Sequence, residues 1–105
     1  MTTPAPTQLT LHKKSRTLEV EFNNGDHFIL PCEYLRVFSP SAEARHEKII
    51  VGKEHVTILA IEPVGHYAVK LVFSDGHRTG IYSWSILHSL GVNQQKNWQH
   101  YLDKK

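Results

Sequence analysis

Cysteine and long apolar stretches are scarce in this sequence of 105 residues. Its single cysteine, Cys32, excludes an internal disulfide and a Cys-x-x-Cys metal knuckle. No apolar run approaches the roughly 20 residues of a membrane helix. The first seven residues, MTTPAPT, lack the ordered basic and apolar regions of a secretory signal. We therefore expect a cytoplasmic protein that does not contact a membrane.

The sequence also lacks a large excess of positive or negative charge, because its net charge is only +2. The basic residues Lys13, Lys14 and Arg16 are too few for a nucleic-acid-binding stripe. Gly52-Lys53 is followed by Glu54, which excludes a phosphate-binding P-loop, and no Gly-x-Gly-x-x-Gly fingerprint occurs. No nucleophile can be paired with an oriented base, so we expect no independent catalysis.

The composition that remains, 40% hydrophobic and 21% charged, is typical of one small globular domain. Small, proline-punctuated residues at the start predict a disordered tail over residues 1–7. The sequence therefore predicts a single domain over residues 8–105.

Alternating apolar and polar residues predict β-strands along much of the chain. Asn24-Gly25 and Asp75-Gly76 favour type I′ hairpin turns between them. Apolar residues on both faces of 56–64 predict a central strand there. The predicted strands are 8–11, 18–22, 27–30, 56–64, 66–73 and 79–82.

Three helices are indicated by terminal residues and periodicity. Pro31 suits the first turn of a helix over 32–37. Ser83 is a suitable N-cap for a helix over 84–90 that ends at Gly91 as its C′ residue. A last helix over 93–102 is expected to pack through Trp98, Tyr101 and Leu102. The predicted fold class is α+β, a mainly antiparallel β-sheet built from hairpins with two or three short helices.

A faint internal repeat runs through the two hairpins at an offset of 51 residues. Four similar positions carry it: Leu18, Val20, Phe22 and Gly25 correspond to Val69, Leu71, Phe73 and Gly76. So few positions leave open whether the chain contains a duplicated unit.

Unusual residues gather in two stretches, LPCEYLRVFSPSAEAR (30–45) and IEPVGHYAVKLVFSDGHRTGIYSW (61–84). With Gly-Lys-x-x-Val at 52–56 and Leu-x-x-Leu-Gly at 87–91, they resemble the gamma-butyrobetaine hydroxylase-like N-terminal domain family. The resemblance covers about residues 8–91 and implies a domain of unknown function in a stand-alone bacterial form. In that family the domain precedes 2-oxoglutarate-dependent hydroxylases and is also fused to iron–sulfur carrier ATPases.

The resemblance also implies a metal ligand. The hydroxylases hold zinc through three cysteines after the Leu-Arg pair and the histidine of an Asp-Gly-His element. Asp75-Gly76-His77 matches that element, so His77 and Asp75 are the metal-ligand candidates, for iron or zinc. Residues 37–43 contain serines and no cysteine, so three of the four ligands are missing.

Each candidate residue also has a plain structural interpretation. His77 is expected to bond a backbone carbonyl beside its turn, and Cys32 to be a small buried residue. Arg36 is expected to pair with a carboxylate such as Glu33 or Asp75, or to cap carbonyls at the end of its helix. The remaining histidines, His12, His27, His46, His55, His88 and His100, lack ligand spacing and are expected to be surface residues.

Two functions compete. The first is a non-catalytic accessory module related to iron or iron–sulfur metabolism, which would meet a protein partner, such as an iron–sulfur carrier or an oxygenase, through Arg36, His77, Tyr82 and Trp84. The second is a small metal-binding protein that uses His77 with other side chains.

Overall fold

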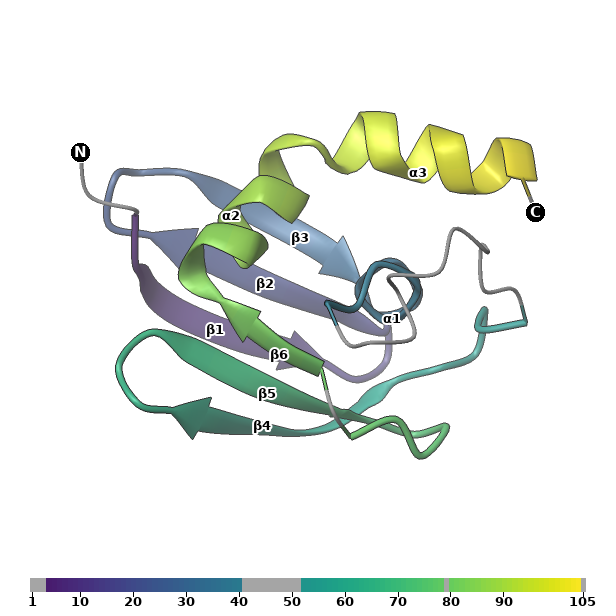
Figure 1. The fold of residues 1–105 in the computed structure, drawn as a ribbon, viewed down its shortest axis with the longest axis horizontal. Helices are drawn as coiled ribbons and strands as arrows, with labels where there is room; N and C mark the ends of the chain where they lie inside the picture. The colour runs from purple at the N-terminus through teal and green to yellow at the C-terminus, as the bar shows by residue number, and fades with distance from the viewer. Residues whose placement is uncertain (1–3, 41–51, 79, 105) are drawn as a thin grey trace.

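The computed structural model describes residues 4–40, 52–78 and 80–104, which form two three-stranded antiparallel sheets and three helices (Figure 1). Sheet A has the strand order β1-β2-β3, and sheet B has the order β4-β5-β6. The predicted α+β class is confirmed. The elements are β1 (Pro6–His12), β2 (Thr17–Phe22), β3 (His27–Pro31), α1 (Cys32–Val37), β4 (Ile58–Val64), β5 (Ala68–Phe73), β6 (Gly80–Ser83), α2 (Trp84–Val92) and α3 (Gln94–Lys104).

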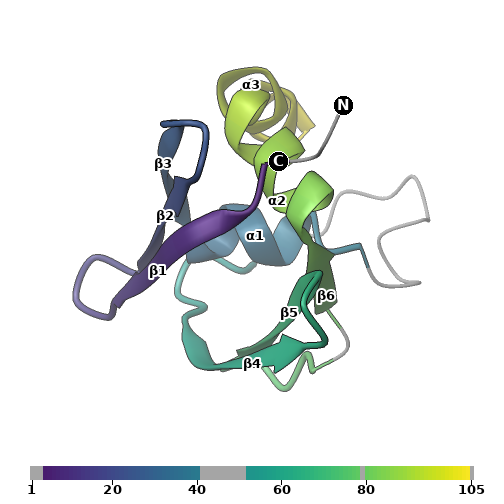
Figure 2. The ribbon, with the colours of Figure 1, turned by 90° about the vertical axis from the view of Figure 1, so that its left-hand side faces the viewer.

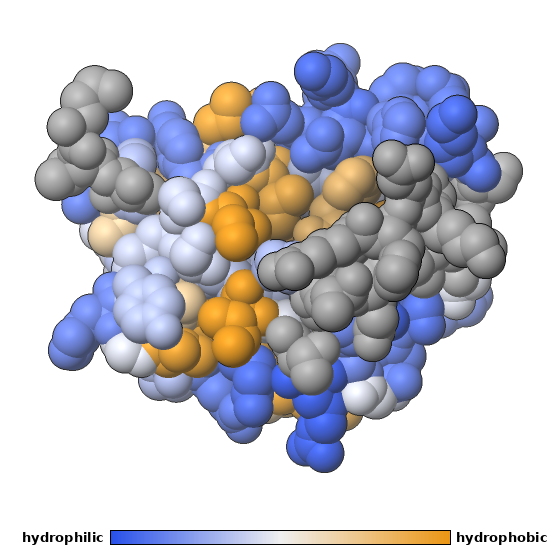
Figure 3. All heavy atoms as spheres, viewed as in Figure 1, coloured by the Kyte–Doolittle hydropathy of each residue, from blue (hydrophilic) through white to orange (hydrophobic). Residues whose placement is uncertain are grey.

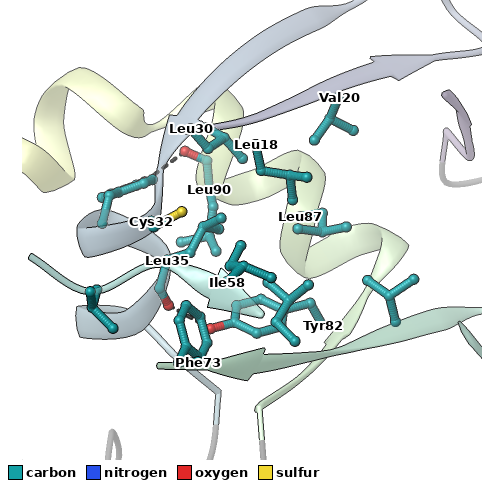
Figure 4. Close-up of a cluster of buried hydrophobic side chains, with 14 of the residues drawn as sticks. Leu18, Val20, Leu30, Cys32, Leu35, Ile58, Phe73, Tyr82, Leu87 and Leu90 are labelled. Atoms are coloured by element: carbon teal, nitrogen blue, oxygen red, sulfur yellow. Dashed lines mark hydrogen bonds between the residues drawn. The ribbon is translucent and has the colours of Figure 1, made fainter. Parts of the chain in front are cut away.

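The hydrophobic core lies between the inner faces of the two sheets and helices α1 and α2 (Figures 2 and 4). Strand alternation supplies it, because every second side chain of β2 and β5 points inward. The larger side chains without solvent exposure are Leu18, Leu30, Tyr34, Leu35, Ile58, Leu71, Tyr82, Leu87 and Tyr101. The opposite face of each sheet points away from this core, although Ala68 and Val72 on that face of β5 are also buried.

The first and fourth strands differ from their predictions. Strand β1 begins at Pro6 and pairs it with Phe22, so residues 6 and 7 belong to sheet A, not to a tail. Strand β4 is an edge strand of sheet B, and β5 is the central one, so the predicted central position of 56–64 was wrong. Pro63 fits this edge position because proline cannot donate a hydrogen bond to a second neighbour.

Both hairpin turns were expected to be type I′, which requires positive φ at two residues, and this was wrong. Gly25 (φ 93°) and Gly76 (φ 91°) do adopt positive φ, but Arg16 is the only described non-glycine residue that does. In the first turn, Gly25 N donates to Phe22 O (3.1 Å) and Phe22 N to Asp26 O (2.8 Å). This is a three-residue loop with a glycine bulge, the next most common hairpin connection.

The second turn repeats these bonds at the offset of 51 residues. Gly76 N donates to Phe73 O (3.2 Å) and Phe73 N to His77 O (2.9 Å). Strands β2 and β5 also have the same length and the same offset, and each leads through a return strand into a helix. The two halves of the described fold therefore share one strand–turn–strand–helix unit.

The helix of each unit contacts the turn of the other unit. Arg36 of α1 binds Asp75 in the second turn, and His88 of α2 binds Asp26 beside the first turn (Nε2–Oδ2, 2.6 Å). These crossed contacts tie the two sheets together through polar groups at the margin of the core.

The cap of α2 follows the prediction at its start and departs from it at its end. The Ser83 side chain accepts a hydrogen bond from Ile86 N (3.2 Å), as expected of an N-cap. Gly91 lies inside the helix, which continues to Val92, so its assignment as C′ was wrong. A Cβ at Gly91 would lie 2.4 Å from the Phe28 ring, so close packing is what requires glycine there.

Helix α3 packs through Trp98 and the fully buried Tyr101, as predicted. The expected packing of Leu102 was wrong, because its side chain is 45% exposed. In the described parts of the chain, the helices have 6, 9 and 11 residues, and none has the length and apolarity needed to cross a membrane.

Candidate functional site

Three of the candidate residues meet where the end of α1 approaches the β5–β6 turn. Arg36, in the last turn of α1, donates from Nε to Asp75 Oδ2 (2.8 Å). Lys53 Nζ lies 2.7 Å from the same oxygen, and the backbone N–H of His77 donates to Asp75 Oδ1 (3.1 Å). We refer to Arg36, Ser39, Lys53, Asp75 and His77 as the Asp75 cluster. Of the two predicted partners of Arg36, the structure selects Asp75.

Electrostatics hold Asp75 in its charged form. Burial alone would raise the pKa of this carboxyl group, but hydrogen bonds from Lys53, the His77 N–H and Arg36 outweigh it and lower the pKa to about 2. The Arg36 side chain is only 8% exposed, and the carboxylate of Asp75 offsets part of the cost of burying its charge. The arrangement is that of a structural ion pair that connects α1 to sheet B.

His77 is 7% exposed, and its Nε2 lies 2.9 Å from Ser39 Oγ. Ser39 is 1% exposed. The distance suits a nucleophile and a base, but burial of the serine denies a substrate access to its Oγ. The pair therefore connects the end of α1 to the β5–β6 turn.

In the described segments, His77 does not belong to any group of three or more His, Cys, Asp or Glu side chains close enough to hold a metal ion. The positions where the family has cysteines fall in 37–43, and residues 41–43 lie outside the described residues. Cys32 is buried, as predicted, and burial raises the pKa of its thiol, so it stays protonated and unreactive.

Tyr82 and Trp84 occupy different environments. Tyr82 is fully buried and donates its hydroxyl to Leu35 O, and burial raises its pKa (Figure 4). Trp84 is partly buried at the other end of β5, where its Nε1 donates to His66 O (2.8 Å). The structure thus groups Arg36, Asp75, His77 and Tyr82 around the end of α1 and places Trp84 elsewhere.

Two features escaped the sequence analysis. On the outer face of sheet A, His12 and His27 both bind Glu19, although these histidines were expected to be isolated surface residues. The sequence could have indicated this contact only if the pairing of the three strands were known, because the pairing places His12, Glu19 and His27 on the same outer face. A groove of about 410 Å³ also lies between β3 and helices α2 and α3, lined by Pro31, Gly91, Val92, Gln94, Gln95 and Trp98.

Comparisons with known proteins agree on one family. Residues 9–88 match the family described as gamma-butyrobetaine hydroxylase-like, N-terminal. No curated protein matches this chain. The chain is similar to the crystal structure of a protein of unknown function in the DUF971 family from Acidithiobacillus ferrooxidans. That protein is 44% identical, with a TM-score of 0.74 over 82% of this chain and 91% of the other.

Two proteins solved by NMR in solution are also similar. One is 52% identical, with a TM-score of 0.84 over 98% of this chain and 83% of the other. The second is 39% identical, with a TM-score of 0.81 over 97% and 84%. The motifs at 30–45 and 61–84, the family match over residues 9–88 and these folds agree, and the chain belongs to the gamma-butyrobetaine hydroxylase-like N-terminal domain family.

Proposed function

We propose that this protein is a non-catalytic accessory module that binds a protein partner, and that the partner belongs to iron or iron–sulfur metabolism. The family description supports an accessory role, since it names an N-terminal domain of hydroxylase-like proteins. The partner classes that fit are an iron–sulfur carrier and an oxygenase.

The chemistry of the Asp75 cluster supports the absence of catalysis. Asp75 is committed to three donors, and a carboxylate with a pKa of about 2 is a poor general base at neutral pH. The Ser39 hydroxyl and the Cys32 thiol are both buried. Among the described residues, these groups stabilise the approach of α1 to sheet B and leave no reactive atom open to a substrate.

The observation that carries the proposal is the difference between the two outer faces. In sheet A the outer positions of the central strand are Thr17, Glu19 and Glu21, which are polar. In sheet B the matching positions of β5 are Ala68, Lys70 and Val72, of which Ala68 and Val72 are apolar and only 0% and 7% exposed, so the exposed apolar surface lies on the flanking strands. Because the two sheets share one architecture, the fold itself does not require this change in polarity.

Apolar residues on the neighbouring strands extend the outer face of sheet B. Ile81 of β6 lies opposite Lys70 and is 45% exposed, and Ala60 and Val64 of β4 lie opposite Val72 and Ala68. Figure 3 shows apolar side chains in the middle of the viewed face, over α2 and β6, with hydrophilic side chains above and below them. An apolar centre with a polar rim is the usual anatomy of a protein–protein interface.

Charge on this face is balanced. Lys70 Nζ lies 3.2 Å from Glu62 Oε1 in the neighbouring strand. A paired lysine and glutamate offer hydrogen-bond donors and acceptors without a strong electrostatic field of one sign. Such a surface is better suited to binding a protein than to binding a nucleic acid. The β5–β6 turn adds the exposed Arg78 at the end of the same sheet.

Two isoleucines give a matched experiment. Ile81 on sheet B is 45% exposed and Ile29 on sheet A is 51% exposed, so aspartate is tolerated at either position in the free protein. Binding of the untagged protein to purified iron–sulfur carrier ATPase and to purified 2-oxoglutarate oxygenase from the same cells is measured by isothermal titration calorimetry.

We expect saturable binding to one of these partners, weakened at least about tenfold by Ile81→Asp and unchanged by Ile29→Asp, since a charge buried in an apolar interface is costly. Equal weakening by both substitutions would refute the assignment to sheet B. Binding of neither partner at concentrations up to about 100 μM would refute the proposed iron-related setting.

A further inference from the structure

The outer face of sheet A brings two histidines onto one carboxylate. His12 Nε2 lies 2.8 Å from Glu19 Oε1, and His27 Nε2 lies 2.5 Å from Glu19 Oε2. The three residues come from β1, β2 and β3, and each occupies an outward position of its strand. Each imidazole therefore directs its Nε2 to a different oxygen of the same carboxylate, one on either side of Glu19.

A second carboxylate lies beside Glu19. Glu21 is two residues from Glu19 on the same face of β2, and its pairing partner across the strands is His27. The ligand-type atoms of Glu19, Glu21 and His27 all lie within 4.8 Å of one another, and His12 joins this group through its contact with Glu19. Metal–ligand bonds of about 2.0–2.2 Å in a tetrahedral site imply ligand atoms roughly 3.3–3.6 Å apart, so small side-chain rotations suffice to enclose an ion.

We propose that His12, Glu19, Glu21 and His27 form a binding site for a divalent transition-metal ion on the outer face of sheet A, and that Zn²⁺ is a suitable occupant. Two imidazoles and two carboxylates suit zinc and its neighbours, whereas calcium and magnesium favour sites made of oxygen alone. The site is separate from the Asp75 cluster and does not involve His77.

The repeated architecture of the chain shows that the fold does not demand these residues. At the offset of 51, Glu19 and Glu21 correspond to Lys70 and Val72 on the outer face of sheet B, and neither of these side chains can bind a cation. Sheet B is formed without such a cluster, so the four side chains are not a requirement of strand pairing.

The site is accessible to an ion. The side chains of His12 and His27 are each 44% exposed and that of Glu19 is 29% exposed, so an ion reaches them without opening the core.

The test uses untagged full-length protein and Zn²⁺ alone. Competition with a chromophoric chelator measures affinity and stoichiometry, and long-range ¹H–¹⁵N spectra of the imidazole rings identify the histidines that bind. We expect one Zn²⁺ per chain and movement of the His12 and His27 Nε2 resonances, with the His88 resonances unchanged. His27→Ala is expected to weaken binding at least about tenfold, as loss of a direct ligand should.

His55→Ala is the matched control, because His55 is an exposed histidine outside the cluster. It should leave the affinity for Zn²⁺ unchanged. Unfolding of each variant in urea, measured without metal, separates loss of a ligand from loss of the fold. No saturable binding below about 100 μM would overturn the proposal, and so would binding that His27→Ala leaves intact or that is lost on His77→Ala.

Discussion

The substitution Asp75→Asn isolates the charge of the ion pair that joins α1 to sheet B. Asparagine keeps the shape of the side chain and can still accept from the His77 N–H, which in the wild type donates to Oδ1 (3.1 Å). It removes the negative charge beside Arg36, whose side chain is 8% exposed, and beside Lys53 at 2.7 Å. We expect the folded state to lose stability without changing its structure.

The magnitude follows from the carboxyl pKa. A folded-state pKa of about 2 in place of 3.8 corresponds to about 2.4 kcal/mol of stabilisation at pH 7. The turn that carries Asp75 borders solvent, and solvent screens part of this interaction. We therefore expect Asp75→Asn to lower the free energy of unfolding by about 1–2 kcal/mol at pH 7, between the values for exposed and fully buried pairs.

The same pKa fixes the pH dependence. Because the folded-state value lies below the unfolded-state value, the stabilisation is complete above about pH 5 and is lost as the pH falls through 3.8 toward 2. The difference between wild type and Asp75→Asn should shrink to roughly half at about pH 3. Urea unfolding of both proteins at pH 7 and pH 3, followed by circular dichroism, measures this directly.

Glu62→Gln supplies the matched control. It removes the charge from an exposed pair, in which Glu62 and Lys70 are 54% and 36% exposed, and should cost less than about 0.5 kcal/mol. If Asp75→Asn costs no more than Glu62→Gln, or if its effect is the same at pH 3 as at pH 7, the reasoning from the partly buried ion pair is refuted.

Three further substitutions test the packing, each by urea unfolding at pH 7. Gly91→Ala should destabilise by about 1–3 kcal/mol, because its Cβ would lie 2.4 Å from the Phe28 ring and overpack that contact. Tyr82→Phe should cost about 1–2 kcal/mol, because it leaves the buried Leu35 carbonyl without its hydroxyl donor. Ser83→Ala should cost about 1 kcal/mol through loss of the N-cap of α2.

Each of these three substitutions has a control variant. Val92→Ala in the same helix as Gly91, and Tyr67→Phe at a tyrosine that is 61% exposed, should both stay within about 0.5 kcal/mol of wild type. Ser83→Asp should retain the cap and most of the stability. The contact between Gly91 and Phe28 would be contradicted if Gly91→Ala were as stable as wild type. The role of the Tyr82 hydroxyl would be contradicted if Tyr82→Phe lost no more stability than Tyr67→Phe. The N-cap would be contradicted if Ser83→Asp lost as much stability as Ser83→Ala.

Much of the local structure could be read from the sequence because it depends on short-range chemistry. Alternation gave the strands, Ser83 identified the start of α2, and Gly25 and Gly76 marked both turns. The type of turn was wrong, because the dipeptides Asn-Gly and Asp-Gly are compatible with two connections. Hydrogen bonds to the flanking strands decide between them.

The candidate site was predictable only in part. The Asp-Gly-His and Leu-Arg motifs singled out Arg36, Asp75 and His77, and the structure does bring them together. The Ser39 partner of His77 lies 38 residues away in sequence, and only the packing of α1 on sheet B reveals it. Trp84 belonged to the same motif but lies at the other end of β5. The return strand β6 carries the chain from the turn that holds Asp75 and His77 back to the start of β5.

The sequence by itself determined the family, the α+β class and the repeated hairpin, because residue patterns and local backbone preferences specify them. Only the tertiary structure decided that β4 is an edge strand, that Gly91 faces Phe28, and that His12 and His27 converge on Glu19. The reason is the same in each case. Strand order, helix packing and cross-strand register join residues far apart in the chain, and no short-range pattern encodes those distances.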